Sequence, residues 1–399
     1  MENSEEFEIV IKTHQGLEEI LEKEAQSHGL NNTQIITRGV KGTGNLETLY
    51  RCNIACRTAM SVLVTVSDFT ASDPDELYQK AVEIPWEKHF GLTKTFAIKG
   101  IIHADYIKNT QYPVLRLKDA VADRFSQKFG ERPSIEKENP DVTLQLLVRD
   151  TNVTVSIDTS GETLNKRGYR VKGLGAPINE ALAAGIIMHT EWKGESDFYD
   201  PFCGSGTLLT EAALIASNTA PNLSRTDFCL KNLKNFNSEL WFTVLEDLKS
   251  KITEPKVQFY GADKFRGAVE TTRKHWLKLG FDLRILHLTH GDFQQLTPKG
   301  KEGIVITNPP YGKRISEKGI KYLYRDLGNL FKRKFTGFTA AVISGSEEGL
   351  KNLGLRPAKK VNMFNGPIES KLYIFDLYSG SKKQGRSYDP RPKYGDKKH

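Results

Sequence analysis

One stretch decides the fold of this chain: Asp200-Pro201-Phe202-Cys203-Gly204-Ser205-Gly206-Thr207. The apolar pair Phe198-Tyr199 before it is typical of a strand end, and residues 208–216 after it are rich in helix-forming alanine and leucine. The pattern predicts a strand that ends at an acid, a glycine turn and a helix. Two glycines let a ligand approach the backbone, and a helix start offers free N–H groups. In open α/β sheets ligands bind beside such strand ends, although the stretch could also be only a tight turn.

A second stretch ends another buried-type strand: Ile304-Val305-Ile306-Thr307-Asn308-Pro309-Pro310-Tyr311-Gly312. Proline has a fixed φ and no N–H, so two prolines hold the loop stiffly and leave its carbonyls free. The Asn308 side-chain oxygen and the Pro309 carbonyl can then accept both hydrogens of one exocyclic base amine, which favours a pyramidal nitrogen with a free lone pair. Tyr311 offers a ring on which the base can stack. The alternative is a simple turn, because Asn-Pro is a common turn signal.

The two stretches resemble the cofactor and catalytic motifs of class I S-adenosylmethionine-dependent methyltransferases that act on base amino groups. The N-terminal half resembles a THUMP RNA-binding region. Together they are similar to the THUMP-domain RNA methyltransferases, especially the bacterial family that makes N2-methylguanosine in 23S rRNA. The resemblance implies S-adenosyl-L-methionine as cofactor, RNA as partner, and catalytic roles for Asn308, Pro309, Pro310 and Tyr311. It implies cofactor binding by Asp200, Pro201, Phe202, Cys203, Gly204, Ser205, Gly206, Thr207 and Asn308.

Two further acids follow expected strands. Asp263 ends the strand 257–263, where a carboxylate can accept both ribose hydroxyls, or can instead cap the next helix. Asp292 ends the next strand and could accept from the adenine amino group, and Phe293 could pack on the adenine ring. Both assignments depend on the order of elements in the resembling family.

The fold class expected is α/β: an N-terminal ferredoxin-like part and a THUMP α/β region, then a Rossmann-like class I methyltransferase domain with a seven-stranded, mostly parallel sheet. We expect a ferredoxin-like part at 1–68, a THUMP domain at 69–160, a basic junction loop at 161–178, a methyltransferase domain at 179–379 and a disordered basic tail at 380–399.

Local patterns predict strands at 33–40 and 46–51, a helix at 53–60, and a polar, aromatic-bearing excursion at 221–253. A helix at 117–129 and a hairpin after it resemble the THUMP core, which in the family holds RNA with little base reading. The alternative for that region is a rigid spacer.

The junction carries Lys166, Arg167, Tyr169 and Arg170, three cations and a ring that suit phosphate contact and base stacking. A solvated linker is the alternative. Arg314, after the proline loop, could also meet a phosphate. Two residues at the start of the next helix, Asn179 and Glu180, are weak candidates for pocket lining, with helix capping as the alternative.

Composition narrows the class of protein. A net charge of +8 over 399 residues and a pI near 9.0 suggest an acidic partner such as nucleic acid. Four cysteines without a C-x-x-C pair indicate neither a zinc site nor a disulfide framework, so we expect no metal. The polar first residues are no signal peptide and no apolar run has membrane-spanning length, which makes a cytoplasmic location the default.

Together with these observations, the resemblance implies an RNA methyltransferase that acts on the exocyclic N2 of a guanine in 23S rRNA. Transfer RNA is an alternative substrate, and adenine N6 is an alternative target because the Asn-Pro-Pro-Tyr loop suits either amine. An RNA-binding or ribosome assembly factor without catalysis is the alternative of another class. The oligomeric state is not determined by the sequence.

Overall fold

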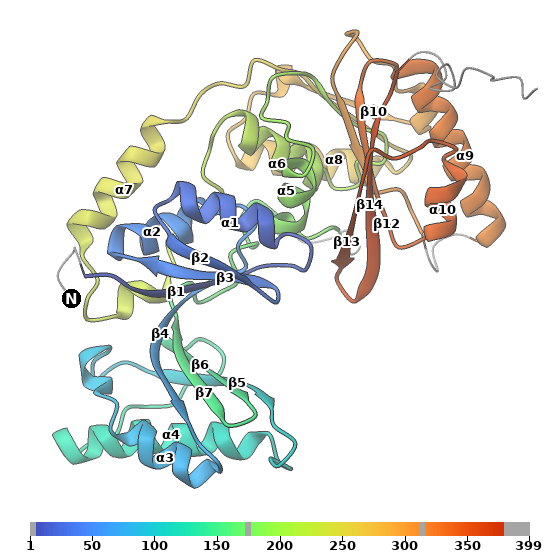
Figure 1. Ribbon diagram of the computed structural model, residues 1–399. Coiled ribbons are helices and arrows are strands. Elements are labelled where there is room, and N and C mark those ends of the chain that lie inside the picture. The colour runs from blue at the N-terminus through green and yellow to red at the C-terminus, as the bar shows by residue number, and fades with distance from the viewer. Residues whose placement is uncertain (1–4, 172–176, 312–315, 379–399) are drawn as a thin grey trace, which may run out of the picture.

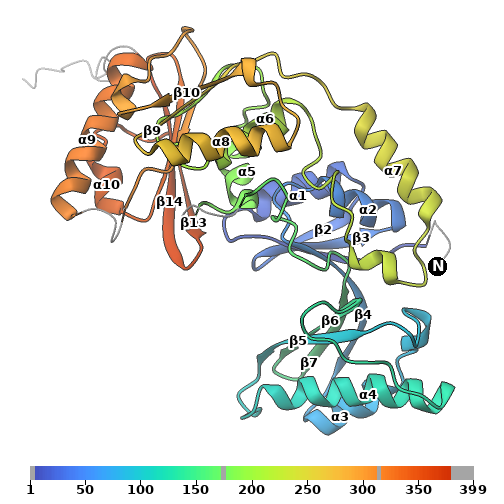
Figure 2. The ribbon, with the colours of Figure 1, turned by 180° about the vertical axis from the view of Figure 1, so that it is seen from behind.

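The computed structural model describes residues 5–171, 177–311 and 316–378. Within these ranges the chain forms two seven-stranded sheets, one in each half of the sequence. Figures 1 and 2 show a lower lobe with α3 and α4, a middle region with α1 and α2, and an upper lobe built on the second sheet. The predicted tail at 380–399, part of the junction loop and Arg314 lie outside the described residues.

The first sheet has the strand order β2-β3-β1-β4-β7-β6-β5. The elements of this half are β1 (Phe7–Lys12), α1 (Glu18–Ser27), β2 (Asn31–Ile36), β3 (Gly39–Gly44), α2 (Leu46–Ala55), β4 (Ser61–Thr70), α3 (Pro74–Val82), η1 (Trp86–Lys88), β5 (Phe96–His103), α4 (Gln111–Phe129), β6 (Val142–Arg149) and β7 (Asn152–Asp158). This order joins a ferredoxin-like βαββαβ unit to the THUMP region, as expected.

The long strand β4 holds these two parts together. Its first residues pair antiparallel with β1, and from Leu63 to Thr70 it pairs antiparallel with β7. In Figure 1, β4 and β7 run together from the middle region into the lower lobe. One continuous set of backbone hydrogen bonds therefore connects the ferredoxin-like part to the THUMP part.

The prediction of a strand at 46–51 is wrong, because these residues begin the helix α2. Asn45 caps that helix by accepting a hydrogen bond from the Thr48 N–H at 3.1 Å. Leu46, Leu49 and Cys52 are all buried, a spacing that fits one face of a helix. The predicted helix at 53–60 overlaps only the last turn of α2.

The second sheet has the order β10-β9-β8-β11-β12-β14-β13, in which only β14 runs antiparallel to the first five strands. The elements are α5 (Glu180–Met188), β8 (Phe198–Asp200), α6 (Thr207–Ala216), η2 (Cys229–Asn232), α7 (Ser238–Ser250), β9 (Phe259–Asp263), α8 (Arg266–Lys278), η3 (Leu283–Ile285), β10 (Leu286–His290), η4 (Phe293–Gln295), β11 (Ile304–Thr307), α9 (Glu317–Lys334), β12 (Thr339–Ser344), α10 (Glu347–Asn352), β13 (Lys359–Asn365) and β14 (Ile368–Asp376). This confirms the expected mostly parallel sheet.

Helices cover both faces of the second sheet (Figures 1 and 2). Side chains of α5, α6 and α8, among them Leu182, Leu209 and Trp276, share one buried cluster with the sheet. Side chains of α9 and α10, such as Phe331 and Leu350, share another cluster. All four residues of β11 are buried, as expected for a central parallel strand. The carboxyl ends of β8, β9, β10 and β11 therefore meet at one edge, which we call the ligand edge.

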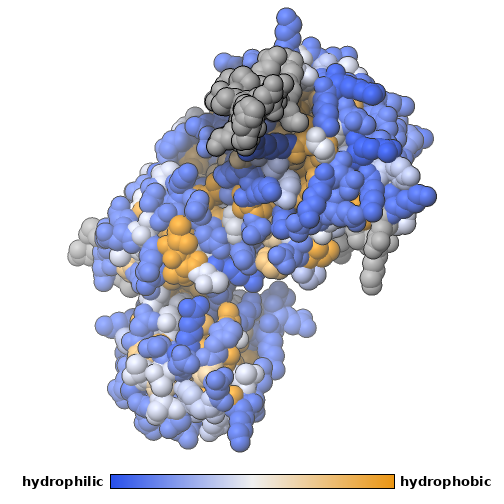
Figure 3. Space-filling view, turned by 45° about the vertical axis from the view of Figure 1, so that its right-hand side comes forward, coloured by the Kyte–Doolittle hydropathy of each residue, from blue (hydrophilic) through white to orange (hydrophobic). Residues whose placement is uncertain are grey.

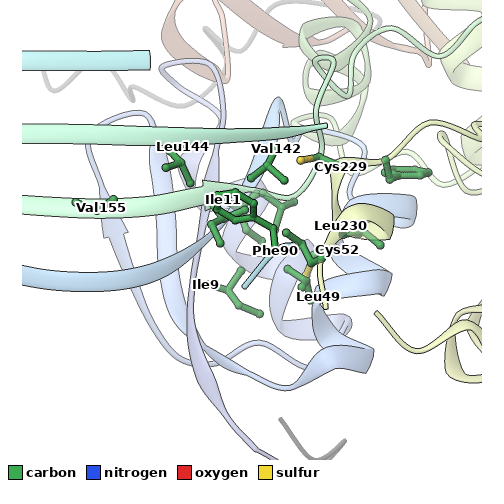
Figure 4. Close-up of a cluster of buried hydrophobic side chains, with 14 of the residues drawn as sticks. Ile9, Ile11, Leu49, Cys52, Phe90, Val142, Leu144, Val155, Cys229 and Leu230 are labelled. Atoms are coloured by element: carbon green, nitrogen blue, oxygen red, sulfur yellow. The ribbon is translucent and has the colours of Figure 1, made fainter. Parts of the chain in front are cut away.

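The excursion at 221–253 is not a simple loop. It contains α7, whose Trp241, Val244 and Leu248 belong to the core cluster of the N-terminal half. Figure 4 shows Leu230 of the same excursion beside Leu49 and Cys52 of α2, and Cys229 beside Val142 of β6. A segment that leaves the second sheet thus binds the ferredoxin-like part before the chain returns to β9.

The surface agrees with the charged composition. Figure 3 shows a face on which hydrophilic residues predominate and apolar residues form scattered patches. No helix among the described residues is both long and apolar enough to cross a membrane.

Candidate active site

The glycine turn between β8 and α6 is shaped by two left-handed residues, Gly204 with φ +54° and Gly206 with φ +75°. A Cβ on Gly206 would lie 2.3 Å from the Thr272 methyl of α8, so this position admits no larger residue. A Cβ on Gly204 would meet no atom within 4 Å. The turn therefore packs closely on α8 at Gly206, whereas no described residue contacts it at the Cβ position of Gly204. This arrangement leaves room for a ligand to bind against the backbone at Gly204.

Asp200, at the end of β8, ties the turn to β11. Its Oδ1 accepts from the Thr307 hydroxyl at 2.7 Å and from the Phe202 N–H at 3.1 Å. The side chain is buried, and this loss of hydration raises the pKa of the Asp200 carboxyl to about 7. Asp200 thus holds the end of β8, which carries the predicted cofactor stretch, next to the end of β11, which carries the predicted catalytic stretch.

Asp263 ends β9 as predicted. Its Oδ2 accepts from the Gly204 N–H at 3.0 Å, and its Oδ1 accepts from the Phe265 N–H at 2.8 Å. A carboxylate has about four lone-pair positions, so the partly exposed Asp263 keeps acceptor capacity for two ribose hydroxyls. Its place beside the glycine turn is consistent with the predicted role, and the role stays a prediction.

The proline loop leaves one acceptor without a donor. The Asn308 Oδ1 is buried and has no hydrogen-bond partner among the described residues. An unpaired buried polar atom costs free energy, so it marks a place where a ligand donor is expected. Pro309 is buried and Tyr311 half-buried, and the Tyr311 hydroxyl accepts from the Asn365 amide at 2.7 Å. The Ser205 Oγ in the glycine turn is a second buried atom at the ligand edge for which the described part of the chain provides no hydrogen-bond partner.

Two aromatic side chains lie near this edge. The rings of Phe202 and Phe293 are tilted against each other with centroids 4.7 Å apart. Phe293 is buried, whereas Asp292 is exposed and accepts from the Gln294 N–H at 2.8 Å as the cap of η4. The structure thus shows a capping role for Asp292, and the predicted adenine contacts of both residues stay predictions.

His275 of α8 connects the glycine turn to the junction loop, and sequence reasoning did not identify it. Its Nε2 accepts from the Val171 N–H at 3.1 Å, so the ring proton is on Nδ1, which donates to the Ser205 carbonyl at 2.9 Å. Burial lowers the pKa of His275, which favours this neutral form. A histidine on a helix carries no spacing signal, so only the fold reveals this link.

Thr307 and Thr272 also escaped the sequence reasoning. Thr307 is the last strand residue of the second stretch, but its hydrogen bond to Asp200 depends on strand pairing between β8 and β11. Thr272 donates to the Gly204 carbonyl at 3.1 Å from α8. Cys203 is buried, as expected for a small residue inside the turn.

The junction prediction needs a correction. Arg167 has a fully buried side chain that donates to the carbonyls of Leu164 and Arg57 and lies 3.8 Å from a Glu211 oxygen. Tyr169 is buried and donates to Glu211 at 3.0 Å. A buried guanidinium or ring cannot reach RNA, so the predicted contacts of both residues are wrong in this conformation.

The other junction cations differ from each other. Arg170 is bound by Glu180 of α5 and by the Ile178 carbonyl, which makes it another internal tie. Lys166 is exposed and pairs with Glu162 four residues earlier. Lys166 is therefore the junction cation that still fits a phosphate contact, and that role stays a prediction.

The start of α5 follows the capping alternative. The Asn179 Oδ1 accepts from the Ala181 N–H at 2.9 Å and from the Leu182 N–H at 3.2 Å. Glu180 is buried, and its carboxylate accepts hydrogen bonds from the side chains of Arg170 and Asn165. Among the residues described, no cluster of His, Cys, Asp and Glu could hold a metal ion.

Comparison with known proteins gives relatives along most of the chain. Several of them, from different bacteria, are named ribosomal RNA large subunit methyltransferase K/L. The one from Syntrophotalea carbinolica is 36% identical over 374 residues, which are 91% of this chain and 52% of that protein. The one from Marinomonas sp. (strain MWYL1) is 35% identical over 392 residues, 96% of this chain and 54% of that protein. The chain spans about half the length of these curated relatives.

Two solved structures resemble the whole fold. SMU.472 complexed with SAH has a TM-score of 0.85 and 27% identity, and the match covers 95% of this chain and 100% of that one. A structure from Listeria monocytogenes str. 4b F2365, described as a predicted N6-adenine-specific DNA methylase, has a TM-score of 0.84 and 27% identity, with 93% and 96% covered.

Family descriptions cover the same regions as the structural parts. Residues 8–63 match the RlmL ferredoxin-like domain and residues 71–158 match the THUMP domain. Residues 167–374, more than half of the chain, match the RMKL-like methyltransferase domain. The chain therefore belongs to the RMKL-like methyltransferase family.

Proposed function

We propose that this protein is an RNA methyltransferase that transfers a methyl group from S-adenosyl-L-methionine to the exocyclic N2 of a guanine in 23S rRNA. One observation carries the proposal: Asn308 presents a buried acceptor, for which the described residues offer no donor, at the end of β11, beside Pro309 and close to the glycine turn. An amino group of a base supplies the missing donor. The naming of the K/L relatives supports large-subunit ribosomal RNA as the substrate.

The ligand edge suits the proposed cofactor. No described residue lies within 4 Å of a Cβ built on Gly204, and the Ser205 hydroxyl just before α6 has no partner among the same residues. Asp263 keeps lone pairs for ribose hydroxyls, and Phe202 with Phe293 provides an aromatic wall. When bound there, the cofactor would supply a methyl group on a sulfonium, which leaves as a neutral thioether. The glycine turn, Asp263 and Asn308 are the residues that we expect to hold it.

The chain's part in the transfer is to position and polarise the amine. Asn308 Oδ1 and the Pro309 carbonyl would each accept one N–H, which directs the nitrogen lone pair toward the methyl carbon. Asn308 and Pro309 would thereby hold the amine nitrogen, which is the nucleophile, in line with the electrophilic methyl group that the bound cofactor would supply. The alkylated nitrogen then loses one proton to water. No general base is needed, because the amine becomes strongly acidic once it is alkylated.

RNA is the proposed partner and the cytoplasm the proposed location. The THUMP region is joined to the ferredoxin-like part through β4, and α7 with the junction joins that part to the second sheet. Such a framework can present a folded RNA to the ligand edge, where the target base must leave its stack to reach Asn308. The net charge of +8 favours an RNA partner.

Adenine N6 is the second candidate target, favoured by the description of the Listeria structure as an adenine-specific DNA methylase. The site itself suits either amine, because Asn308 and Pro309 contact only the amino group. Transfer RNA is a further alternative substrate, and a silent RNA-binding factor is the alternative without catalysis.

The deciding experiment is methyl transfer from labelled S-adenosylmethionine to total RNA of a strain that lacks this gene, followed by digestion to nucleosides. Labelled N2-methylguanosine in 23S rRNA supports the proposal, whereas the same nucleoside in transfer RNA changes only the substrate. Labelled N6-methyladenosine would show that the target base is adenine and not guanine. Cofactor binding without labelling of free RNA or of ribosome assembly intermediates would favour the binding factor.

A further inference from the structure

The β13–β14 hairpin reaches beyond the ligand edge. The last pair between β12 and β14 joins Ser344 to Lys371, but the hairpin continues to the pair Asn365–Ile368. Because β13 runs in the same direction as β12, its end at Asn365 lies on the side where β11 gives way to the proline loop. Figure 1 shows this hairpin projecting from the sheet on the side of the lower lobe.

The hairpin tip forms a seat for Tyr311. Asn365 donates its amide N–H to the Tyr311 hydroxyl at 2.7 Å. A Cβ on Gly345, just after β12, would lie 2.9 Å from the Tyr311 ring and 2.7 Å from the Ile368 side chain. Both side chains thus approach the bare backbone of Gly345. The hydrogen bond from Asn365 and the close packing of the ring on Gly345 therefore set the orientation of the Tyr311 ring.

The hairpin is also braced from the ferredoxin-like part. A Cβ on Gly16 would lie 2.4 Å from the Asn362 carbonyl of β13, and the buried Met363 shares a cluster with Leu17. Asn365 is therefore presented from a strand held by contacts on both sides. Such rigid support is what orientation of a reacting group requires.

We propose that Asn365 is a positioning residue for methyl transfer, which acts by holding the Tyr311 ring against the target base. The inference rests on the proposed function, in which Tyr311 stacks on that base. Since the amide donates, the Tyr311 hydroxyl keeps its own proton for an acceptor on the flipped nucleotide. Loss of the Asn365 amide frees the ring to rotate and lowers the fraction of bound base in the reactive orientation.

The test is a double-mutant cycle between Asn365→Ala and Tyr311→Phe, read as the single-turnover rate of transfer to RNA. Asn365→Ala alone should slow the rate about tenfold, with the affinity for S-adenosylmethionine unchanged. In the Tyr311→Phe background, where the hydroxyl is already absent, Asn365→Ala should have less than about a twofold effect. Equal effects of Asn365→Ala in both backgrounds would overturn the inference.

Two further variants separate positioning from general damage. Gly345→Ala keeps Asn365 but pushes on the ring, so it should slow transfer by a similar factor. Asn362→Ala changes an exposed asparagine of the same strand and should leave the rate unchanged. A loss of rate with Asn362→Ala equal to that with Asn365→Ala would contradict a specific role.

A failure of the proposed function can be told apart from a failure of this inference. If the wild-type protein methylates no RNA, the proposed function fails, and crystal structures of the wild-type protein and Asn365→Ala decide the inference. An unchanged Tyr311 ring in the variant would overturn it, and a displaced ring would support it.

Discussion

The junction loop and the proline loop are alike in sequence, since each contains a tyrosine close to polar residues. In the folded chain, however, their polar side chains have different surroundings. In the junction, Arg167 contacts two carbonyls and faces Glu211, and Tyr169 donates to the same carboxylate. In the proline loop, the buried Asn308 Oδ1 has no described donor. The residue types in a loop therefore predict its function less well than knowing whether its polar side chains have partners inside the protein.

The difference has a physical origin. The Arg167 guanidinium is surrounded by groups from α6, from the segment after α2 and from the junction itself, and so connects the ferredoxin-like part to the second sheet. Asn308 lies where strand ends meet and helices start, an edge that leaves polar groups for a ligand. A loop inside an interface between two parts uses most of its polar groups in contacts that hold the parts together, although the Arg167 Nε has no hydrogen-bond partner among the described residues. A loop at the ligand edge keeps its unpaired acceptor where a ligand can bind.

The largest effect is expected for Arg167→Ala, which removes one partner of a buried ion pair. The uncompensated Glu211 charge should lower the free energy of unfolding by about 3–5 kcal/mol. Chemical denaturation measures this loss. RNA affinity per folded molecule should stay unchanged; a stable variant with weakened RNA binding would restore the original interpretation of the junction.

Asn308→Ala should give the opposite result. The variant loses an acceptor that no described residue uses, so the denaturation midpoint should hardly fall. The transfer rate should drop by about 10²–10³-fold, as when one preorganised polar group at a reacting centre is removed. Calorimetry should find cofactor binding largely intact. Full activity of the variant would remove the amine-polarising role from Asn308.

The sequence predicted the elements that its local patterns encode. β9 and β11 follow from apolar runs, and the turn after β8 follows from its glycines. Helices α2 and α7 were missed although their signals are local: Asn45 caps α2, and Trp241, Val244 and Leu248 of α7 have helical spacing. Strand-forming residues in the first helix and the polar surroundings of the second concealed them.

The burial of the junction was beyond sequence reasoning. Arg167 meets Arg57 and Glu211, which are distant in the chain, and His275 meets Val171 and Ser205 only after α8 has packed. Local patterns describe strands and turns, but not which cation will be enclosed when two sheets are joined. The candidate site was predicted where it consists of contiguous motifs, and missed where it consists of contacts between them.

Asp200→Asn tests a carboxylate that shares features with both the junction and the proline loop. Its Oδ1 accepts hydrogen bonds from the protein, as the junction groups do, but its burial at the ligand edge disfavours the charged form. An asparagine oxygen can keep both hydrogen bonds. The pKa of Asp200, raised to about 7, means that its contribution to stability is fully present below about pH 4 and is lost as pH rises through 7. The variant should therefore gain stability relative to wild type between these values.

Denaturation of both proteins without cofactor at a series of pH values measures this difference. A constant difference from pH 4 to pH 8 would show that the Asp200 carboxyl is not strongly desolvated. A difference that changes in the opposite direction would mean that the charged form is favoured by the fold.

The smallest effect is expected for Lys166→Ala, which tests whether any part of the junction touches RNA. Lys166 is exposed and pairs with the exposed Glu162, so its loss should leave stability unchanged. If it contacts one phosphate, RNA affinity falls a few-fold and the slope of log K against log salt decreases by about 1. Glu162→Gln releases the same ammonium and should strengthen binding slightly. If neither variant alters affinity or slope, the junction is a structural tie throughout, and the contrast with the proline loop is complete.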